Sequence, residues 1–233
     1  MVELGWRVEN WTAPARARAM VLEGRAVRLE PLGSGHVADL HAANRVDDAI
    51  WDYLPYGPFA DEAAYGAWVA EVAGRDDPLF FAVIDPATGR PGGVMSLMRI
   101  TPEAGTIEVG HICLSPGLRR TRAATEAIHL LADWAFGAGY RRFEWKCDAL
   151  NRPSRRAAER FGFSYEGVFR QALVVKGRNR DTAWFAMIDR DWPCLSAAYA
   201  AWLDDGNFDA EGRQARSLGG LTAPCRVASD PEG

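Results

Sequence analysis

Apolar and polar residues alternate along most of the chain with one of two periods, and these periods predict the order of its elements. A two-residue period or a short apolar run predicts strands at 26–33, 78–85, 93–101, 106–115, 141–149, 165–175 and 182–189. Spacings of three and four residues predict helices at 34–45, 61–75, 122–138, 153–161 and 194–206. This order predicts an α/β (α+β) fold with a mixed, mostly antiparallel central sheet flanked by helices.

The two ends of the chain lie outside this pattern. Residues 1–22 precede the first strand and carry Trp6 and Trp11, so we expect an N-terminal arm. The main domain is predicted to span 23–193, and 194–233 to form a helix and a tail. From about Phe208 the tail is rich in Gly, Arg and Asp, which favours weak order.

Composition indicates a soluble globular protein. The chain has 233 residues, of which 48% are hydrophobic and 25% charged, enough to bury a sizeable core. No stretch resembles a membrane span, and the charged start lacks the apolar centre of a signal peptide, so we expect a cytoplasmic protein without a membrane partner. The four cysteines lie far apart, which predicts neither a metal site nor a disulfide framework. The sequence is compatible with a homodimer as well as with a monomer.

Positive charge is concentrated in one part of an otherwise acidic chain. Residues 114–180 hold 14 Lys and Arg against 6 Asp and Glu, a balance of +8, whereas the net charge of the whole chain is −4. Arg119, Arg120 and Arg122 gather just before a predicted helix. A solvated face or nucleic acid would also suit such charge, but the acidic total argues against nucleic acid. A compact polyphosphate at the helix N-terminus fits best.

Two motifs at a fixed separation carry a family resemblance. The loop GLRRTRAAT follows the strand TIEVGHICLSP, and LNRPSRRAAERFGF follows the strand FEWKCDA. In this order they resemble the core of the GCN5-related N-acetyltransferases (GNAT), in particular the RimJ/RimL-type branch. The resemblance implies an acetyl-CoA-dependent N-acetyltransferase whose splayed strands form the cofactor cleft. Its acceptor would be a primary amine, either a protein N-terminus or a small molecule.

The resemblance also implies how the cofactor is bound. In the family the loop after the fourth strand binds the pyrophosphate through its amides, in a pattern that Arg119, Arg122 and Ala124 match. Arg122 departs from it, because glycine is usual there, and an ordinary helical backbone is expected at that position. The implied acetyl-CoA-binding residues are Ile112, Leu114, Arg119, Arg120, Thr121, Arg122, Ala123, Ala124, Thr125, Asn151 and Ser154.

Amide formation requires a base, and Glu108 is our candidate because the family often places its base on this strand. Two-residue alternation puts Gly110, Ile112 and Leu114 on the face of Glu108 and predicts the opposite face for His111, packed on helices. Burial would raise the pKa of a glutamate there. A structural salt bridge is the alternative role of Glu108, and His111 is the alternative base.

The departing thiolate requires a stabilising group or an acid. Many family members use a tyrosine late in the second motif's helix, but Ala158 stands at that position. In the RimJ/RimL-type branch a serine near the helix start is proposed, which Ser154 matches. Simple helix capping would also explain Ser154, and turn formation would explain Asn151.

The acceptor site is predicted less sharply. Tyr53 and Tyr56, in the aromatic segment WDYLPYGPF, are candidate acceptor-binding residues, although core packing explains them equally well. Asp148, just beyond a strand, is a third candidate. A noncatalytic acyl-CoA-binding module is the alternative to an enzyme.

Overall fold

A computed structural model describes residues 4–232 and contains one eight-stranded sheet. The strand order is β1-β2-β3-β4-β5-β6-β8-β7. The strands are β1 (Leu22–Glu23), β2 (Arg28–Pro31), β3 (Leu79–Asp85), β4 (Arg90–Thr101), β5 (Thr106–Leu114), β6 (Arg142–Asp148), β7 (Ser164–Val175) and β8 (Arg178–Ile188). Only β5 and β6 pair in parallel. The predicted mixed, mostly antiparallel sheet is confirmed.

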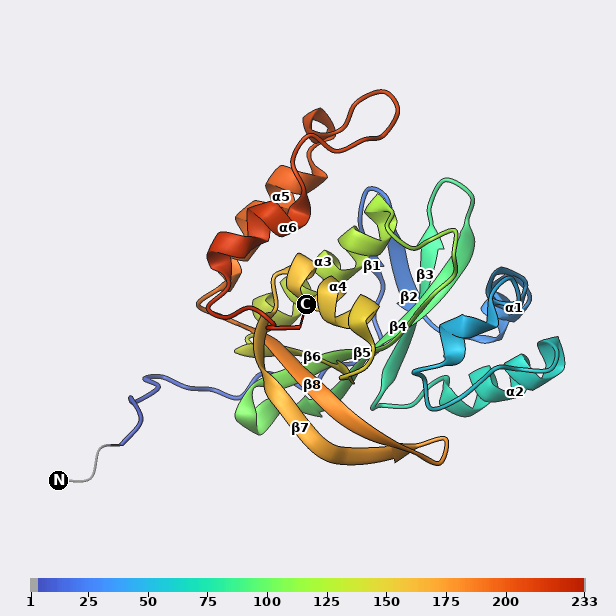
Figure 1. The fold of residues 1–233 in the computed structure, drawn as a ribbon, viewed down its shortest axis with the longest axis horizontal. Coiled ribbons are helices and arrows are strands. Elements are labelled where there is room, and N and C mark those ends of the chain that lie inside the picture. The colour runs from blue at the N-terminus through green and yellow to red at the C-terminus, as the bar shows by residue number, and fades with distance from the viewer. Residues whose placement is uncertain (1–3, 233) are drawn as a thin grey trace.

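Helices cover both faces of this sheet. They are α1 (Val37–Asn44), α2 (Glu62–Val72), α3 (Arg122–Gly137), α4 (Arg152–Phe161), α5 (Trp192–Leu203) and α6 (Leu218–Thr222). One hydrophobic core lies between the sheet and α3 and α4, and a second lies between the sheet and α1 and α2. Figure 1 shows these two layers, with α1 and α2 well separated from α3 and α4. The six consecutive buried residues that begin β3 fit a strand covered on both faces.

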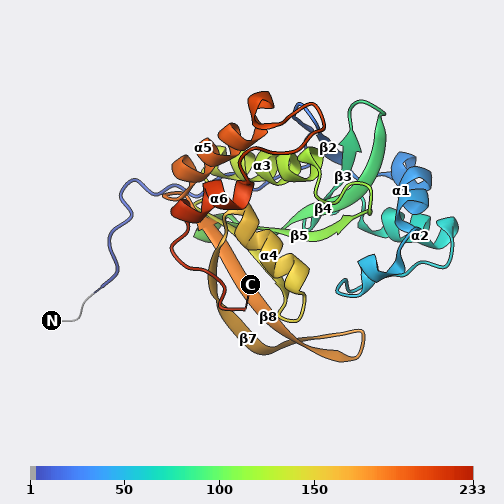
Figure 2. The same cartoon turned by 45° about the horizontal axis from the view of Figure 1, so that its top comes forward.

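The C-terminal segment differs from the expectation of weak order. Ser217 caps α6, whose Leu218 and Thr222 are fully buried. Figure 2 shows α6 beside α5 and the chain end close to α4, and the helix contacts agree. A Cβ at Gly162, where φ is 97°, would meet Leu195 2.4 Å away. The end of α4 and the C-terminal segment therefore pack closely.

The cysteine prediction is wrong for one pair. Cys194 at the start of α5 and Cys225 after α6 form a disulfide, whereas Cys113 and Cys147 are free and buried. The pair is 31 residues apart in sequence, so nothing in the spacing indicated that α5 and α6 would pack together. Closing a loop of this length stabilises the fold by up to about 4 kcal/mol on the chain-entropy estimate.

The N-terminal arm is held against the edge of the domain. The Tyr140 hydroxyl donates to the carbonyl of Ala15 and accepts from the amide of Ala17. Arg16 donates to the carbonyl of Ile100 and pairs with Asp77. Within residues 4–232, no helix has both the length and the apolarity required to cross a membrane.

Candidate functional site

The parallel strands β5 and β6 separate after a short paired stretch. Their pairing runs from Thr106 with Arg142 to Val109 with Trp145 and then stops, although both strands continue. Beyond this point, the backbone N–H and C=O groups on the facing edges of the two strands do not pair with each other. These diverging edges match the splayed strands that the family resemblance implies.

A β-bulge in β5 changes the face of every residue that follows it. The register with β4 shifts between Ser96, opposite Gly110, and Val94, opposite Cys113, and His111 adopts a left-handed φ of 50°. An extra residue in one strand inverts the alternation beyond it. The prediction that Ile112 and Leu114 share the face of Glu108 is therefore wrong, because both pack toward α3.

His111 lies on the α1 and α2 face, not against α3. Its ring stacks on Tyr56, with ring centroids 5.6 Å apart, and lies 4.9 Å from Phe80. Burial, aided by the positive charges of Arg99 and Arg180, lowers the pKa of His111 from 6.5 to about 4. The bulge thus brings a neutral imidazole to the same face as Glu108.

Glu108 is buried and lies between two cations. It is 2% exposed, and its Oε1 accepts from Arg99 Nη1 at 2.6 Å. Lys146 Nζ lies 2.8 Å from Oε2, but the angle is not that of a hydrogen bond and Oε2 has no aligned donor among the described residues. One carboxylate oxygen is therefore fixed, while the other retains a lone pair.

The two cations belong to a longer row of ion pairs across the sheet. Lys146 also donates to Glu144 at 2.7 Å, and Arg142 donates to Glu144 at 2.6 Å. Burial alone would raise the pKa of Glu144, but the hydrogen bonds from Arg142 and Lys146 lower it overall. The alternating charges run in the order Arg99, Glu108, Lys146, Glu144, Arg142 and Glu166.

The backbone of the basic loop meets the requirements of an anion site. Thr121 caps α3 by accepting from the amide of Ala124, and Arg120 before it has a left-handed φ of 62°. Arg122 is helical, as expected from its missing glycine. Because amides in a first turn have no intrahelical partner, those of Arg122 and Ala123 can bind an anion.

The arginine side chains of this loop are not equally available. Arg119 donates through Nε to the carbonyl of Leu114 at 3.1 Å. Arg122 pairs with Asp205 at 3.2 Å and lies 3.4 Å over the ring of Phe208. Arg120 has no acidic partner within 4 Å in the described chain, so its charge is the least neutralised of the three.

At the start of α4, the capping residue is Asn151 and not Ser154. The Asn151 side chain accepts from the amide of Ser154 at 3.1 Å. Ser154 Oγ instead accepts from Trp145 Nε1 at 3.1 Å. Capping therefore does not explain Ser154, whose hydroxyl lies between the Trp145 ring N–H and the Cys147 thiol. Ala158, at the usual tyrosine position, is fully buried.

Of the predicted acceptor-binding residues, Tyr53 and Asp148 lie near the end of β6, whereas Tyr56 lies on the α1 and α2 face. Tyr53 is exposed and donates to the carbonyl of Leu150 at 3.2 Å. Tyr56 is half-buried on His111, and burial raises its pKa. Asp148 accepts from the amide of Leu150 at 2.9 Å, so it serves the turn that precedes α4. Lys176 Nζ, in the turn between β7 and β8, donates to the carbonyl of Trp51.

Sequence reasoning missed Arg99, Trp145 and Lys146. Trp145 and Lys146 lie within a strand that was identified, but their partners depend on how β6 aligns with β5 and α4. A search for cations on neighbouring strands at the parity of Glu108 would have found Lys146. Arg99 lies in an irregular part of β4 with a φ of 47°, which no simple alternation predicts.

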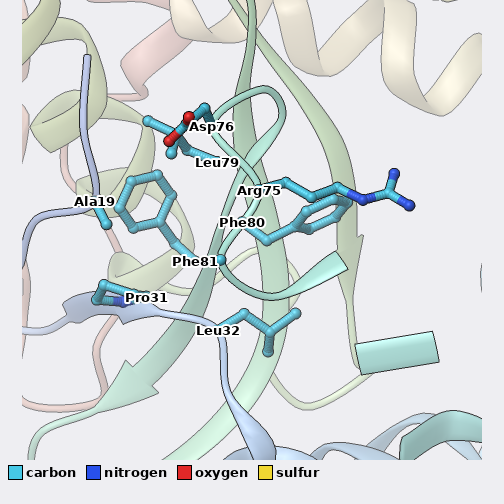
Figure 3. Close-up of a pocket in the computed structure, with 9 residues that line it drawn as sticks. Ala19, Pro31, Leu32, Arg75, Asp76, Leu79, Phe80 and Phe81 are labelled. Atoms are coloured by element: carbon cyan, nitrogen blue, oxygen red, sulfur yellow. The ribbon is translucent and has the colours of Figure 1, made fainter. Parts of the chain in front are cut away.

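Two cavities lie away from these residues. Figure 3 shows one of about 90 Å³ between the N-terminal arm, β2 and the turn before β3, with Ala19, Pro31 and Phe81 among its lining residues. The other lies in the C-terminal segment around Asp204 and Arg216. The described residues contain no group of three or more His, Cys, Asp or Glu placed to hold a metal.

Comparisons with known proteins agree with the fold described above. The Acetyltransferase (GNAT) domain family matches residues 26–164. A GCN5-related N-acetyltransferase from Brucella melitensis is 48% identical, with a TM-score of 0.90 over 93% of this chain and 100% of that one. A probable acetyltransferase of the GNAT family from Chromobacterium violaceum is 42% identical, with a TM-score of 0.77 over 83% and 98%.

A more distant structure shares the fold alone. An acetyl transferase from Salmonella typhimurium that modifies the N-terminal serine of a 50S ribosomal subunit protein is 20% identical, with a TM-score of 0.63 over 72% of this chain and 99% of that one. No match was found among curated proteins. The family match and the two closer structures show that this chain belongs to the GNAT acetyltransferase family, whose members transfer an acetyl group from acetyl-CoA.

Proposed function

We propose that this protein is an N-acetyltransferase that transfers the acetyl group of acetyl-CoA to a primary amine, with a protein N-terminus as the leading acceptor. The observation that carries the proposal is the separation of β5 and β6 after Val109 and Trp145. Glu108 projects from β5 on one face of the sheet, and Ser154 contacts Trp145 of β6 on the opposite face. Both residues therefore lie beside the point where these two strands separate. A base on one side could take the proton of the attacking amine, while an acid on the other side protonates the departing sulfur.

The residues of the loop and of α4 fit acetyl-CoA, which supplies the activated acetyl thioester. The amides of Arg122 and Ala123, with the charge of Arg120, would hold the pyrophosphate. The unpaired edge of β5 at Ile112 and Leu114 would bind the pantetheine arm, and an amide there would polarise the thioester carbonyl. Thr121 and Thr125 complete the first turn of α3, while Asn151 orders the start of α4.

Glu108 is the proposed base because Oε2 has a lone pair without an aligned donor, and Arg99 fixes the rest of the carboxylate. It would receive the proton of the acceptor ammonium directly or through water. His111 is the second candidate, since its neutral ring shares that face. Its pKa of about 4 keeps the ring neutral at pH 7, so it could also accept a proton.

Ser154 is the proposed proton donor to the departing sulfur. Trp145 occupies an acceptor site on Oγ and thereby orients the hydroxyl. The Cys147 thiol lies in the same surroundings, and burial raises its pKa to about 11, against a lowering by its hydrogen bond with Ser154. Cys147 therefore stays protonated and does not compete as a thiolate at neutral pH.

Release of free thiol from acetyl-CoA, measured with N-terminal peptides, polyamines and aminoglycosides, tests the proposed function. We expect Glu108→Gln to lower kcat by roughly 10²-fold at pH 7, the usual scale for a general base, and to lose less at high pH where the amine is already neutral. Asp148→Asn is the matched control and should show no such pH dependence.

Three results would each overturn all or part of this proposal. Saturable CoA binding with no turnover on any amine would indicate a noncatalytic acyl-CoA-binding module. If only the small amines react, the acceptor is a small molecule and not a protein N-terminus. Full activity of the Glu108 variant at pH 7, with a pH-dependent loss in a His111→Asn variant, would assign the base to His111.

A further inference from the structure

A row of hydrogen-bond donors without partners runs along β8 on the face of Glu108. Arg180, Thr182 and Trp184 occupy every second position of the strand. Ala183 and Phe185, on either side of Trp184, pack into the α3 and α4 core, so the three point to the opposite face. Arg180 Nε, Thr182 Oγ1 and Trp184 Nε1 are all buried and have no hydrogen-bond partner among the described residues. Unpaired buried donors are costly, so a ligand that supplies acceptors here would be favoured.

Trp184 links this row to Glu108. It pairs across the strands with Lys146, whose Nζ lies 3.9 Å over the Trp184 ring and 2.8 Å from Glu108. Phe169 also stacks on Trp184, with ring centroids 4.4 Å apart. The row therefore begins beside the proposed base and continues toward the turn between β7 and β8.

Arg180 adds a positive charge that the protein does not neutralise. It is half-buried and forms no ion pair with the described acidic residues, whereas Arg99 and Lys146 are both paired with Glu108. Its charge reaches His111, whose pKa it helps to lower after burial and Arg99. A half-buried guanidinium without a partner is suited to bind a carboxylate through two parallel hydrogen bonds.

We propose that Arg180 binds a carboxylate of the acceptor and, with Thr182 and Trp184, selects acidic N-terminal segments. The inference rests on the proposed function, since it names the acceptor of that reaction. Trp184 and Arg180 are four positions apart, about 13 Å along an extended strand. The carboxylate consequently belongs to the second or third residue of the acceptor, while backbone carbonyls between it and the amine face Thr182 and Trp184.

Matched peptides test this assignment. We would compare Ala-Asp-Ala with Ala-Asn-Ala and Ala-Ala-Asp with Ala-Ala-Asn, all amidated at the C-terminus, together with free aspartate and asparagine. The wild type should prefer an Asp peptide by roughly 10- to 100-fold in kcat/KM, the range for a hydrogen-bonded charge pair. Arg180→Gln should abolish this preference, and Arg178→Gln, an exposed arginine on the same strand, should retain it.

Equal rates on Asp and Asn peptides, or an equal loss on both in Arg180→Gln, would overturn the inference. A preference restricted to the free amino acids would overturn the peptide placement. If no acceptor reacts, calorimetric binding of the same peptides to the CoA complex separates the two proposals. Preferential binding of the Asp peptide without turnover would overturn the enzyme and keep the carboxylate site, whereas no preference would overturn the site.

Discussion

The lowered pKa of His111 predicts that this residue makes the fold sensitive to acid. Its pKa is about 4 in the folded chain, against 6.5 as its ordinary value, so the unfolded chain binds more protons in the interval between them. The stabilisation is complete above pH 6.5 and disappears as the pH falls through 4. Linkage over this 2.5-unit difference gives a loss of about 2 kcal/mol between pH 7 and pH 5, and about 3 kcal/mol below pH 4.

His111→Asn isolates this contribution. Asparagine tolerates the left-handed φ of 50° and does not titrate, so the lost ring contacts lower stability by the same amount at every pH. Urea unfolding of both proteins at pH 7, 6 and 5 should show the variant losing about 2 kcal/mol less than the wild type over this range. All other carboxylates and histidines are common to both proteins and cancel in the comparison. Parallel pH profiles would refute the reasoning.

Two further predictions concern the cofactor side of the site. Ser154→Ala should lower kcat at least 10-fold with little change in melting temperature, because Asn151 and not Ser154 caps α4. Asn151→Ala should lower the free energy of unfolding by about 1 kcal/mol. Unchanged turnover in Ser154→Ala would remove Ser154 from the mechanism. Arg120→Ala should weaken CoA binding, measured by calorimetry, more than Arg122→Ala does, because Asp205 and Phe208 hold the Arg122 side chain. If Arg122→Ala weakens binding more, Arg122 leaves Asp205 to bind the phosphates.

Local patterns were sufficient to predict the sheet and its helices. The run Leu79–Asp85 and the amphipathic segment Arg122–Gly137 bury long apolar faces, and such faces determine an element's type with little help from distant residues. The two family motifs also fixed the places of the α3 and α4 N-termini. Those features depend on spacing along the chain, and the spacing is visible in the sequence.

The missed features depend on pairing between distant segments. One extra residue at His111 reversed the faces of Ile112 and Leu114, and two-residue alternation contains no signal for such a bulge. Glu108 was recognised, but its partners Arg99 and Lys146 reach it from β4 and β6 and depend on register. Cys194 and Cys225 form a disulfide because α5 and α6 pack together.

The C-terminal segment supports both motifs that carry the family resemblance. Asp205 and Phe208 hold Arg122 at the start of α3, and the buried Asp230 pairs with the buried Arg155 of α4. Removing Arg155 would leave Asp230 as an uncompensated buried charge, at a cost of about 3–5 kcal/mol. The Cys194–Cys225 disulfide closes a loop that contains Asp205 and Phe208 and ends five residues before Asp230, so the segment links the start of α3 to α4. The geometry of the proposed cofactor site would therefore depend on residues outside the matched 26–164 domain.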